Sequence, residues 1–261
     1  MAVGDLKIDA RRNKILEILN RDGQVRVTQL SEELGATTVT IRSDLDALEQ
    51  DGYLERIQGG AVQTVRNYYN LEFLRRKQEN SEAKKSIASA AADIIRDGDT
   101  ILINSGTTTY YTAIELKKRK KLNIVTNSLM VASELGAYPT FRVILLGGEI
   151  NTQYSFTYGS DAQEQLRQYK AEYAILSMDG VCFENGLTTY HAEEAVINRI
   201  MMDRAKKTVI VADSRKLGRE GFLHVSDLLN MDILVTDQEA DLQFLSRLQE
   251  KKVEVFYGKD E

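Results

Sequence analysis

A run of small polar residues at positions 104–109, NSGTTT, is the stretch of this sequence best suited to bind an anion. It follows the β-branched run TILI and precedes a helical pattern, which predicts a turn that opens a helix. Hydroxyl groups, an accessible glycine backbone and the free amides of a helix N-terminus are donors that hold phosphate in proteins. Serine and threonine also cap helices, so a turn without a ligand is the alternative. The candidate ligand groups are Asn104, Ser105, Gly106, Thr107, Thr108 and Thr109.

Further polar turns follow other predicted strands. They are TNS at 126–128, GGE at 147–149, DG at 179–180 and ADSRKLG at 212–218. In open α/β sheets, ligands bind outside the carboxyl ends of the strands, so the common position of these turns indicates one site. The site residues predicted from these turns are Asn127, Gly147, Gly148, Asp179 and Lys216.

The stretch NGLTTY at 185–190 is interpreted as another turn, before a helix that opens with Glu193 and Glu194. Thr188 and the carboxylate of Glu194 suit sugar hydroxyls, because both groups accept hydrogen bonds from an O–H. Acidic residues in a first helical turn also stabilise the helix dipole, so both glutamates can be present without a ligand role.

The elements that position these turns are short β-branched runs that alternate with helical patterns from Thr100 onward. The runs typical of strands are TILIN, NIVTN, FRVILLGG, EYAILSM, TVIVAD, MDILVTD and VEVFY. The helical patterns between them are YYTAIELKKRKK, LMVASELG, AQEQLRQY, AEEAVINRIMMDRAKK and DLQFLSRLQEKK. This alternation predicts an α/β domain with a largely parallel sheet.

Residues 27–61 indicate a separate small module, made of a helix, a tight turn, a second helix and a glycine-tipped hairpin. Thr28 is placed to cap the first helix and Gly35 to end it, and Thr37 is placed to cap the second. Gly59 and Gly60 allow the positive φ angles of the hairpin turn. This is the plan of a winged helix-turn-helix, whose second helix enters the major groove of DNA.

The second helix of this module carries Ile41, Leu45 and Leu48 on one apolar stripe, which leaves small and hydrogen-bonding residues facing outward. Such a face suits the base edges of a major groove, and Arg42 is the best candidate for a base or phosphate contact. Small helical modules with similar turns also dock proteins, so partner docking without nucleic acid is the alternative. The predicted DNA-binding residues are Arg11, Arg26, Thr37, Thr38, Thr40, Arg42, Ser43 and Arg56.

The domains predicted from these patterns are a winged helix-turn-helix at 1–63, a helical connector at 64–80 and an α/β sensor domain at 81–261. The connector is neither Gly-rich nor Pro-rich, which favours an ordered helix over a loose tether. In the first domain, the helical pattern DARRNKILEILNRDG places Arg11 and Arg12 at its solvated start, where they can reach phosphates.

Composition limits the classes of function that remain. The net charge of −5 and the pI near 5.4 argue against a general polyanion-binding surface, so contact with DNA must be made by a local patch. The chain has no apolar run of membrane-spanning length and no signal-peptide pattern, and we expect a cytoplasmic protein. Cys182 is interpreted as a packed thiol, and His191 and His224 lack ligand spacing, so neither a metal nor a cofactor is expected.

The stretch ATTVTIRSDLDALEQDGYLERIQGGA resembles the DNA-binding signature of the DeoR-type family of bacterial transcription regulators. In that family a Val-Ser-x-x-Thr-Ile-Arg-Arg-Asp-Leu helix precedes a wing that ends Gly-Gly-Ala. This chain departs from the pattern at Ala36, Thr37 and Ser43. The departure at Ser43 removes a positive charge, which puts one phosphate or guanine contact in doubt and indicates a distinct operator sequence.

The resemblance continues through KKSIA, NSGTTT, TNS, LGGE, NGLTTYHAEEA and ADSRKLG, which occur in the family's order and cover nearly the whole chain. It implies a sensor domain related in fold to ribose-phosphate isomerases and a phosphorylated sugar as effector. The departures in the implied pocket are Asn104 for the usual aspartate, Asn198 for a common lysine and Leu217 for phenylalanine.

The residues and the resemblance together predict a DNA-binding transcription regulator, a repressor of a carbohydrate catabolic operon that is controlled by a phosphorylated sugar. The predicted partners are operator DNA, the sugar and further copies of the chain, since paired half-sites mirror a two-fold dimer or tetramer. No membrane partner is expected. The alternative is a sugar-phosphate isomerase with an appended module, in which Asp179, Glu193 or Glu194, together with Lys216, supplies the acid–base groups.

Overall fold

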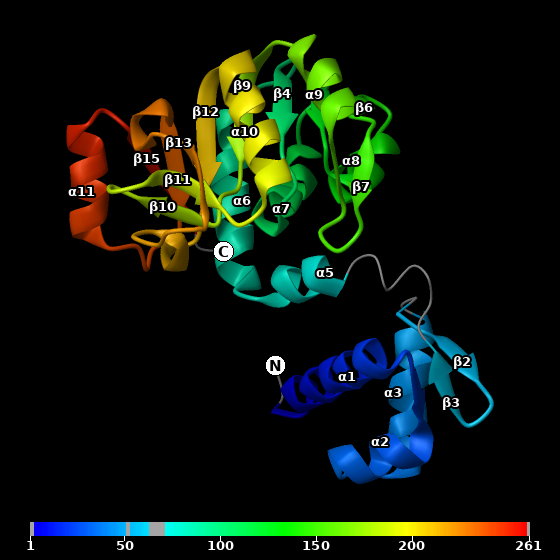
Figure 1. Ribbon diagram of the computed structural model, residues 1–261. Helices are drawn as coiled ribbons and strands as arrows, with labels where there is room; N and C mark the ends of the chain where they lie inside the picture. Colours follow the sequence, from blue (N-terminus) through cyan, green and yellow to red (C-terminus); the bar gives the residue numbers. More distant parts are fainter. Residues whose placement is uncertain (1–2, 51–52, 63–70, 260–261) are drawn as a thin grey trace. The chain divides into compact units, whose positions relative to one another are not determined.

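The computed structural model describes residues 3–50, 53–62 and 71–259, and the chain divides into two compact units, Met1–Leu71 and Glu72–Glu261 (Figure 1). Within these described ranges, no helix combines the length and the apolar character needed to cross a membrane. The predicted connector at 64–80 begins in residues outside the described ranges and continues as helix α5 (Leu71–Gln78). Its bounds stay a prediction.

The N-terminal unit consists of three helices and a small antiparallel sheet of strand order β1-β3-β2, among the residues described. Its elements are α1 (Val3–Asp22), β1 (Gln24–Arg26), α2 (Val27–Leu34), α3 (Thr38–Gln50), β2 (Glu55–Ile57) and β3 (Gly60–Val62). The predicted helix, turn, helix and hairpin are all present. The predicted stripe of Ile41, Leu45 and Leu48 is buried in the core of the unit, where it packs with residues of α1 such as Ile15.

One of the predicted helix ends is wrong. Thr28 lies inside α2, because β1 runs directly into the helix at Val27 and Arg26 occupies the N-cap position without a side-chain hydrogen bond. Gly35 ends α2 as predicted, with a φ of 61° in the left-handed region. Thr37 caps α3 as predicted, since its Oγ1 accepts the amide of Thr40 at 3.2 Å.

The two glycines of the wing have different roles. Gly59 has a φ of 81°, as the predicted hairpin turn requires. Gly60 was predicted to share this conformation, and that is wrong: its φ lies outside the range of +20° to +160° that favours glycine. A Cβ at Gly60 would lie 2.0 Å from the carbonyl oxygen of Val25, so glycine is needed for the close approach of β3 to β1.

A buried carboxylate ties α1 to α3. Asp44, whose side chain is 3% exposed, accepts from Nε of Arg11 at 2.5 Å and from Nε of Arg12 at 3.3 Å. The predicted position of both arginines at a solvated helix start is therefore wrong, because α1 already begins at Val3 and both side chains turn toward α3. The ion pair satisfies a carboxylate that would otherwise be buried at high cost.

We predict that Asp44→Asn lowers the opening free energy of the N-terminal unit by about 1.5–3 kcal/mol, because it weakens hydrogen bonds to charged donors. Hydrogen exchange of α1 and α3 amides in the full chain measures this energy. Asp46→Asn is the matched control on the same helix, since its pair with Arg56 is 59% exposed at the carboxylate and should contribute below about 1 kcal/mol. Equal losses in the two variants would contradict the prediction.

The C-terminal unit is built on a seven-stranded sheet of order β15-β14-β12-β9-β4-β5-β6, in which each neighbouring pair is parallel (Figure 1). The predicted fold class is confirmed, and each of the predicted strand runs forms one strand of this sheet. These strands are β4 (Thr100–Ile103), β5 (Asn123–Thr126), β6 (Arg142–Leu145), β9 (Ala171–Leu176), β12 (Ala205–Val211), β14 (Ile233–Thr236) and β15 (Glu254–Tyr257).

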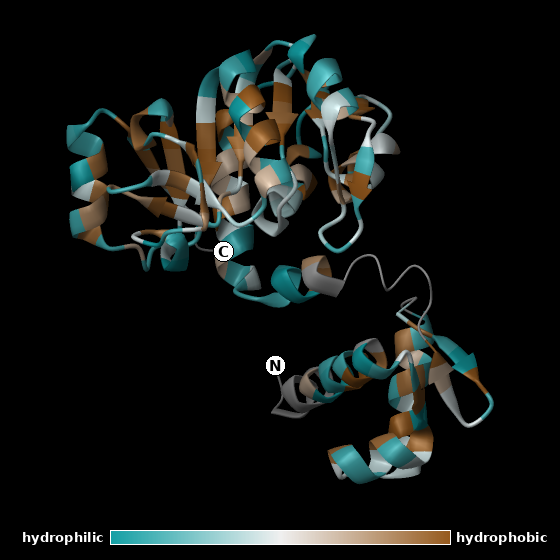
Figure 2. Ribbon diagram, viewed as in Figure 1, coloured by the Kyte–Doolittle hydropathy of each residue, from teal (hydrophilic) through white to brown (hydrophobic). Residues whose placement is uncertain are grey.

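Helices cover both faces of this sheet, and the alternation along each strand explains why. On β4, Ile101 and Ile103 pack in the cluster that contains residues of α6, α7 and α8, whereas Leu102 packs in the cluster that contains residues of α9, α10 and α11. Figure 2 shows the resulting hydrophobic strands beneath helices with hydrophilic outer faces. The helices are α6 (Ser81–Ile94), α7 (Thr107–Leu116), α8 (Leu129–Gly136), α9 (Ser160–Arg167), α10 (Ala192–Arg204) and α11 (Leu242–Glu250).

Short strands outside the main sheet depart from the sequence interpretation. NGLTTY, interpreted as a turn, contains strand β11 (Gly186–Thr189), which pairs on both sides with β10 (Gly180–Cys182) and β13 (Leu223–Ser226). A hairpin of β7 (Glu149–Asn151) and β8 (Phe156–Tyr158) follows the GGE turn. Each of these strands has only three or four residues, too few to show a clear alternation in the sequence, and β11 also depends on pairing with the distant β13.

Candidate functional site

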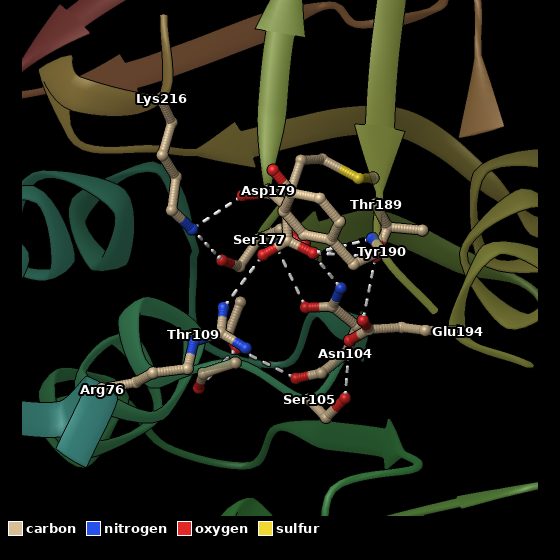
Figure 3. A network of polar contacts seen from close by, with 12 residues as sticks. Arg76, Asn104, Ser105, Thr109, Ser177, Asp179, Thr189, Tyr190, Glu194 and Lys216 are labelled. Carbon is tan, nitrogen blue, oxygen red and sulfur yellow. Dashed lines mark hydrogen bonds and ion pairs between the residues drawn. The ribbon is translucent and has the colours of Figure 1, made fainter. Parts of the chain in front are cut away.

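The carboxyl ends of three neighbouring strands bring polar residues together. β12, β9 and β4 are adjacent in the sheet and parallel, so the residues that follow them meet at one edge. Ser105 follows β4, Asp179 follows β9, and Lys216 ends a short 3-10 helix, η1 (Ser214–Lys216), after β12. Figure 3 shows these side chains in one network with groups from α5 and α10.

Two carboxyl groups at this edge share one threonine hydroxyl. Glu194 of α10 contacts Ser105 Oγ at 2.9 Å and Thr189 Oγ1 at 3.2 Å, and Asp179 contacts the same Thr189 Oγ1 at 3.0 Å (Figure 3). Thr189 carries one hydroxyl hydrogen and cannot donate to both carboxyls at once. A proton on Glu194 resolves this, because the neutral carboxyl donates to Thr189, which donates to Asp179.

The surroundings of the two carboxyls separate their pKa values. Burial and the nearby charge of Asp179 raise the pKa of Glu194 to about 7. Burial also favours the neutral form of Asp179, but the positive charges of Arg76 and Lys216 outweigh it and lower the pKa of Asp179. The pair therefore holds one negative charge and one proton near neutral pH, which suits recognition of sugar hydroxyls as donors and acceptors.

Two cations complete the network. The guanidinium of Arg76 in α5 lies 3.1 Å from Asp179 Oδ1 and 5.8 Å from the ring centre of Tyr154. The ammonium of Lys216 donates to the carbonyl of Met178 at 2.7 Å and to Ser177 Oγ at 3.3 Å. Burial, then the charge of Arg76, lowers the pKa of Lys216. An anion between these groups would relieve the repulsion between the two cations.

The NSGTTT run opens α7 with unpaired donors. Gly106 is the N-cap residue, and the amide of Tyr110 makes the first bond of the helix, to the Gly106 carbonyl. The amides of residues 107–109 precede that bond and have no acceptor inside the helix. Thr108 Oγ1 is buried and finds no hydrogen-bond partner among the residues that the structure describes. The first turn of α7 therefore offers several donors to an anion.

A small pocket lies between this helix N-terminus, Arg76 and Glu194, while Asp179 and Lys216 lie outside its lining. Its position matches the edge of the sheet that the sequence predicted to carry the site. Its lining residues are Phe73, Arg76, Ser105, Gly106, Thr107, Tyr154 and Glu194.

Asn104 positions this pocket rather than lining it. Its Nδ2 donates to the Ser177 carbonyl at 3.0 Å and to Asn198 Oδ1 at 2.9 Å, while its Oδ1 accepts the Ser177 amide at 3.0 Å. Both ends of the amide are therefore used, in full burial, to join β4, β9 and α10. The two departures from the family pattern at Asn104 and Asn198 are a single hydrogen-bonded pair, in which neutral groups replace charged ones.

Asn127 and Gly147 lie at the ends of β5 and β6, outside the lining of this pocket. Asn127 Nδ2 donates to the Thr157 carbonyl at 3.2 Å, and its buried Oδ1 has no partner among the described residues. The amide of Gly147 donates to Gln165 Oε1 at 3.0 Å. Their present contacts hold the β7–β8 hairpin and α9.

Gly148 and Thr188 also make structural contacts. A Cβ at Gly148 would lie 2.3 Å from the carbonyl oxygen of Tyr158, so the β7–β8 hairpin requires glycine there. Thr188 Oγ1 accepts the amide of Gly221 at 2.7 Å and is buried beside β13. The effector role predicted for these residues stays a prediction.

Sequence reasoning missed Phe73, Arg76 and Tyr154, which line the pocket. Phe73 and Arg76 lie in α5, which was predicted as connector alone, and Tyr154 lies between β7 and β8. The amphipathic stretch LEFLRRKQ was the available indication, but periodicity does not tell which domain a helical face covers.

The outward face of α3 is exposed, as a recognition helix requires. Val39 is 72% exposed, and Arg42 makes no hydrogen bond or ion pair with any residue that the structure describes. Thr37 Oγ1 and Thr40 Oγ1 lie 2.8 Å apart at the start of the helix, next to Thr38. A shallow surface groove on this helix is lined by Val39, Arg42, Ser43, Asp46, Ala47 and Gln50.

The other predicted DNA-binding arginines differ in their surroundings. Arg26 is exposed at the end of β1. Arg56 is half-buried, since its Nε pairs with Asp46 at 2.9 Å and its Nη1 donates to the Gly60 carbonyl at 2.8 Å. Arg11 is engaged by Asp44. Arg26 and Arg42 are therefore better placed than Arg11 and Arg56 for a new phosphate or base contact.

Family models match both parts of the chain. The DeoR-like helix-turn-helix domain matches residues 11–66, and the DeoR C terminal sensor domain matches residues 79–238. The chain belongs to the DeoR family. As a member, it is a DNA-binding transcription regulator with a C-terminal sensor domain.

Curated relatives match over nearly their full lengths. The lactose phosphotransferase system repressor of Lactococcus lactis subsp. lactis is 35% identical over 92% of this chain and 95% of its own. The transcriptional regulator YulB of Bacillus subtilis (strain 168) is 33% identical over 94% and 95%. The transcriptional repressor CsqR of Escherichia coli (strain K12) is 30% identical over the whole of both chains. These homologues are regulators and not enzymes, so the isomerase alternative is rejected.

Solved structures of ribose 5-phosphate isomerase A overlap part of the chain. The enzyme from Methanocaldococcus jannaschii is 18% identical, with a TM-score of 0.41 over 53% of this chain and 55% of its own.

We predict that Glu194→Gln removes a pH dependence of stability. The pKa of Glu194 rises from 4.5 in the unfolded chain to about 7 in the folded one, so the folded state binds the proton more tightly. The tighter proton binding adds on the order of 3 kcal/mol to the free energy of unfolding. This stabilisation is fully present below pH 4.5 and is lost as the pH rises to about 7.

Urea unfolding at steps between pH 4.5 and 7 measures the effect, with Glu193→Gln as the exposed control in the same helical turn. The difference between wild type and Glu194→Gln should change across this window. A constant difference would show that Glu194 ionises normally.

Proposed function

We propose that this DeoR-family regulator is a repressor of a carbohydrate catabolic operon and that a phosphorylated sugar in the pocket at the N-terminus of α7 controls its operator affinity. The observation that carries the proposal is the convergence of Arg76, Glu194 and the N-terminus of α7 on one pocket, with Asp179 paired to Arg76 beside it. The names of the relatives support it, because one is a lactose phosphotransferase system repressor and another a putative aga operon repressor.

The pocket offers complementary groups for the two ends of such a ligand. The free amides of the first turn of α7, with Arg76 and Lys216 nearby, suit the phosphate. The charged Asp179 and the neutral Glu194 suit hydroxyl groups, which need both acceptors and donors. Some of the predicted effector residues at this edge, which run from Asn104 to Lys216, then contact the ligand. The others hold those residues in place.

The output of the regulator is operator binding by α3. Arg42 and Val39 present a free donor and an exposed apolar group, which suit a base edge and a thymine methyl. Because operators contain paired half-sites, the protein binds DNA as a dimer or tetramer. The protein acts in the cytoplasm. Its segments are a winged helix-turn-helix at 1–63, a helical connector at 64–80 and a sensor domain at 81–261.

A thermal-shift panel tests the ligand. The probes are ribose 5-phosphate, glucose 6-phosphate, fructose 1-phosphate, tagatose 6-phosphate, N-acetylglucosamine 6-phosphate and inorganic phosphate. We expect one sugar phosphate to raise the unfolding temperature more than inorganic phosphate does, because a ligand that binds only the folded state stabilises it.

Thr108→Val should weaken the response to that sugar phosphate, since it removes the buried hydroxyl that lacks a partner while keeping its shape. Thr112→Val is the matched control one turn later, where the hydroxyl already donates to the Thr108 carbonyl at 3.0 Å. An undiminished response in Thr108→Val would remove this hydroxyl from the site.

Arg42→Ala should weaken operator binding by about 1–3 kcal/mol if the guanidinium reads a base, and it should flatten the salt dependence if the contact is to phosphate. Gel-shift titrations with the DNA upstream of the chain's own gene at several salt concentrations separate the two cases. Arg21→Ala is the control, because Arg21 is an exposed arginine of the same unit that pairs with Asp22. Equal affinities of wild type and Arg42→Ala would contradict the role of α3.

A further inference from the structure

Helix α5 lies between the two family models, yet it forms one wall of the pocket. The models match residues 11–66 and 79–238, and α5 spans Leu71–Gln78. Phe73 and Arg76 of this helix line the pocket with the first turn of α7. The chain reaches α5 directly from the segment that follows the wing, so this helix is the first part of the sensor unit that the DNA-binding unit is joined to.

Contacts with α6 and α7 fasten α5 at its backbone and its aromatic side. The rings of Phe73 and Tyr110 meet edge to face with centres 5.5 Å apart, and the hydroxyl of Tyr111 donates to the Lys77 carbonyl at 3.2 Å. The buried ammonium of Lys84 donates to the carbonyl of Arg76. Tyr110 and Tyr111, which follow the unpaired amides of α7, therefore contact α5 directly.

The side chain of Arg76 pairs with Asp179 and also lines the pocket at the N-terminus of α7. In this structure it pairs with Asp179 at 3.1 Å, with the arginine 26% and the aspartate 14% exposed. Ser105, Gly106 and Thr107, at the N-terminus of α7, line the same small pocket. A phosphate bound there lies within reach of the guanidinium and can accept two of its N–H groups.

We infer that Arg76 is the residue that couples ligand binding to α5: a phosphate group at the N-terminus of α7 takes its guanidinium from Asp179, and α5 shifts with it. This inference rests on the proposed function. Asp179, once released, accepts a hydroxyl of the ligand, so the exchange leaves no buried charge without a partner. The two arrangements of Arg76 are the two states that a ligand must distinguish in order to change operator affinity.

The first test compares Arg76→Gln with Arg75→Gln, a matched arginine on the same helix that is 60% exposed and pairs with Glu79. Operator affinity is measured by gel shift without ligand and with the sugar phosphate that gives the largest thermal shift in the wild type. Ligand concentrations are raised until the thermal shift of each variant saturates, so that weaker binding is not mistaken for lost coupling.

In the wild type and in Arg75→Gln, the saturating ligand should change operator affinity by about 5- to 150-fold, the usual range of coupling between two sites. In Arg76→Gln the change should fall below about twofold, although the ligand still binds. Wild-type coupling in saturated Arg76→Gln would overturn the inference and leave the proposed function intact. A wild type that responds to none of the probes would overturn both.

Asp179→Asn provides a second test that leaves α5 unaltered. This variant removes the charge that holds Arg76 in the ligand-free state, so its operator affinity without ligand should move toward the value of the ligand-bound wild type. Hydrogen exchange of amides 73–78 should change in the same direction in Asp179→Asn and in the wild type with saturating ligand. Exchange and operator affinity that match the ligand-free wild type would contradict the inference.

Discussion

The parallel direction of the seven-stranded sheet is the constraint on which the sensor unit depends. Since neighbouring strands run the same way, the residues that follow them and the N-termini of the helices they lead into meet at one edge. This edge gathers donors from α7 and side chains from the turns that follow β4, β9 and β12, and no single segment carries a complete site. The same packing places helices on both faces, so the strands are apolar on both sides and the polar groups are confined to the ends.

The charged groups at this edge of the sheet are buried close together, so the charge of each depends on the others. Burial raises the pKa of Glu194 and lowers the pKa of Lys216, which favours the neutral form of each side chain. Asp179 stays charged because the positive charges of Arg76 and Lys216 lower its pKa. A buried charge is tolerated only with partners, so a change at one of these residues alters the others. In the proposed mechanism, a ligand that brings its own charge enters this balance directly and alters the contacts at α5.

Local patterns predicted much of the architecture. The strands of the main sheet were visible because they are short apolar runs rich in β-branched residues, and α3 because Ile41, Leu45 and Leu48 repeat at the period of a helix. Loop chemistry predicted the end of α2 at Gly35 and the cap at Thr37. It failed at Thr28 and Gly60, where β1 and its pairing with β3 decide the conformation.

The sequence by itself determined the two-part organisation, the parallel sheet, the helix-turn-helix and the family, because periodicity, turn residues and motifs can be read along the chain. Only the tertiary structure decided the partners of the charged side chains. Arg11 meets Asp44 across 33 residues, and Arg76 meets Asp179 across 103, through contacts that no local pattern encodes. For that reason Arg11, expected in a DNA-binding patch, is paired with a buried carboxylate of its own unit, and Arg76, expected in a connector, lines the pocket at the N-terminus of α7.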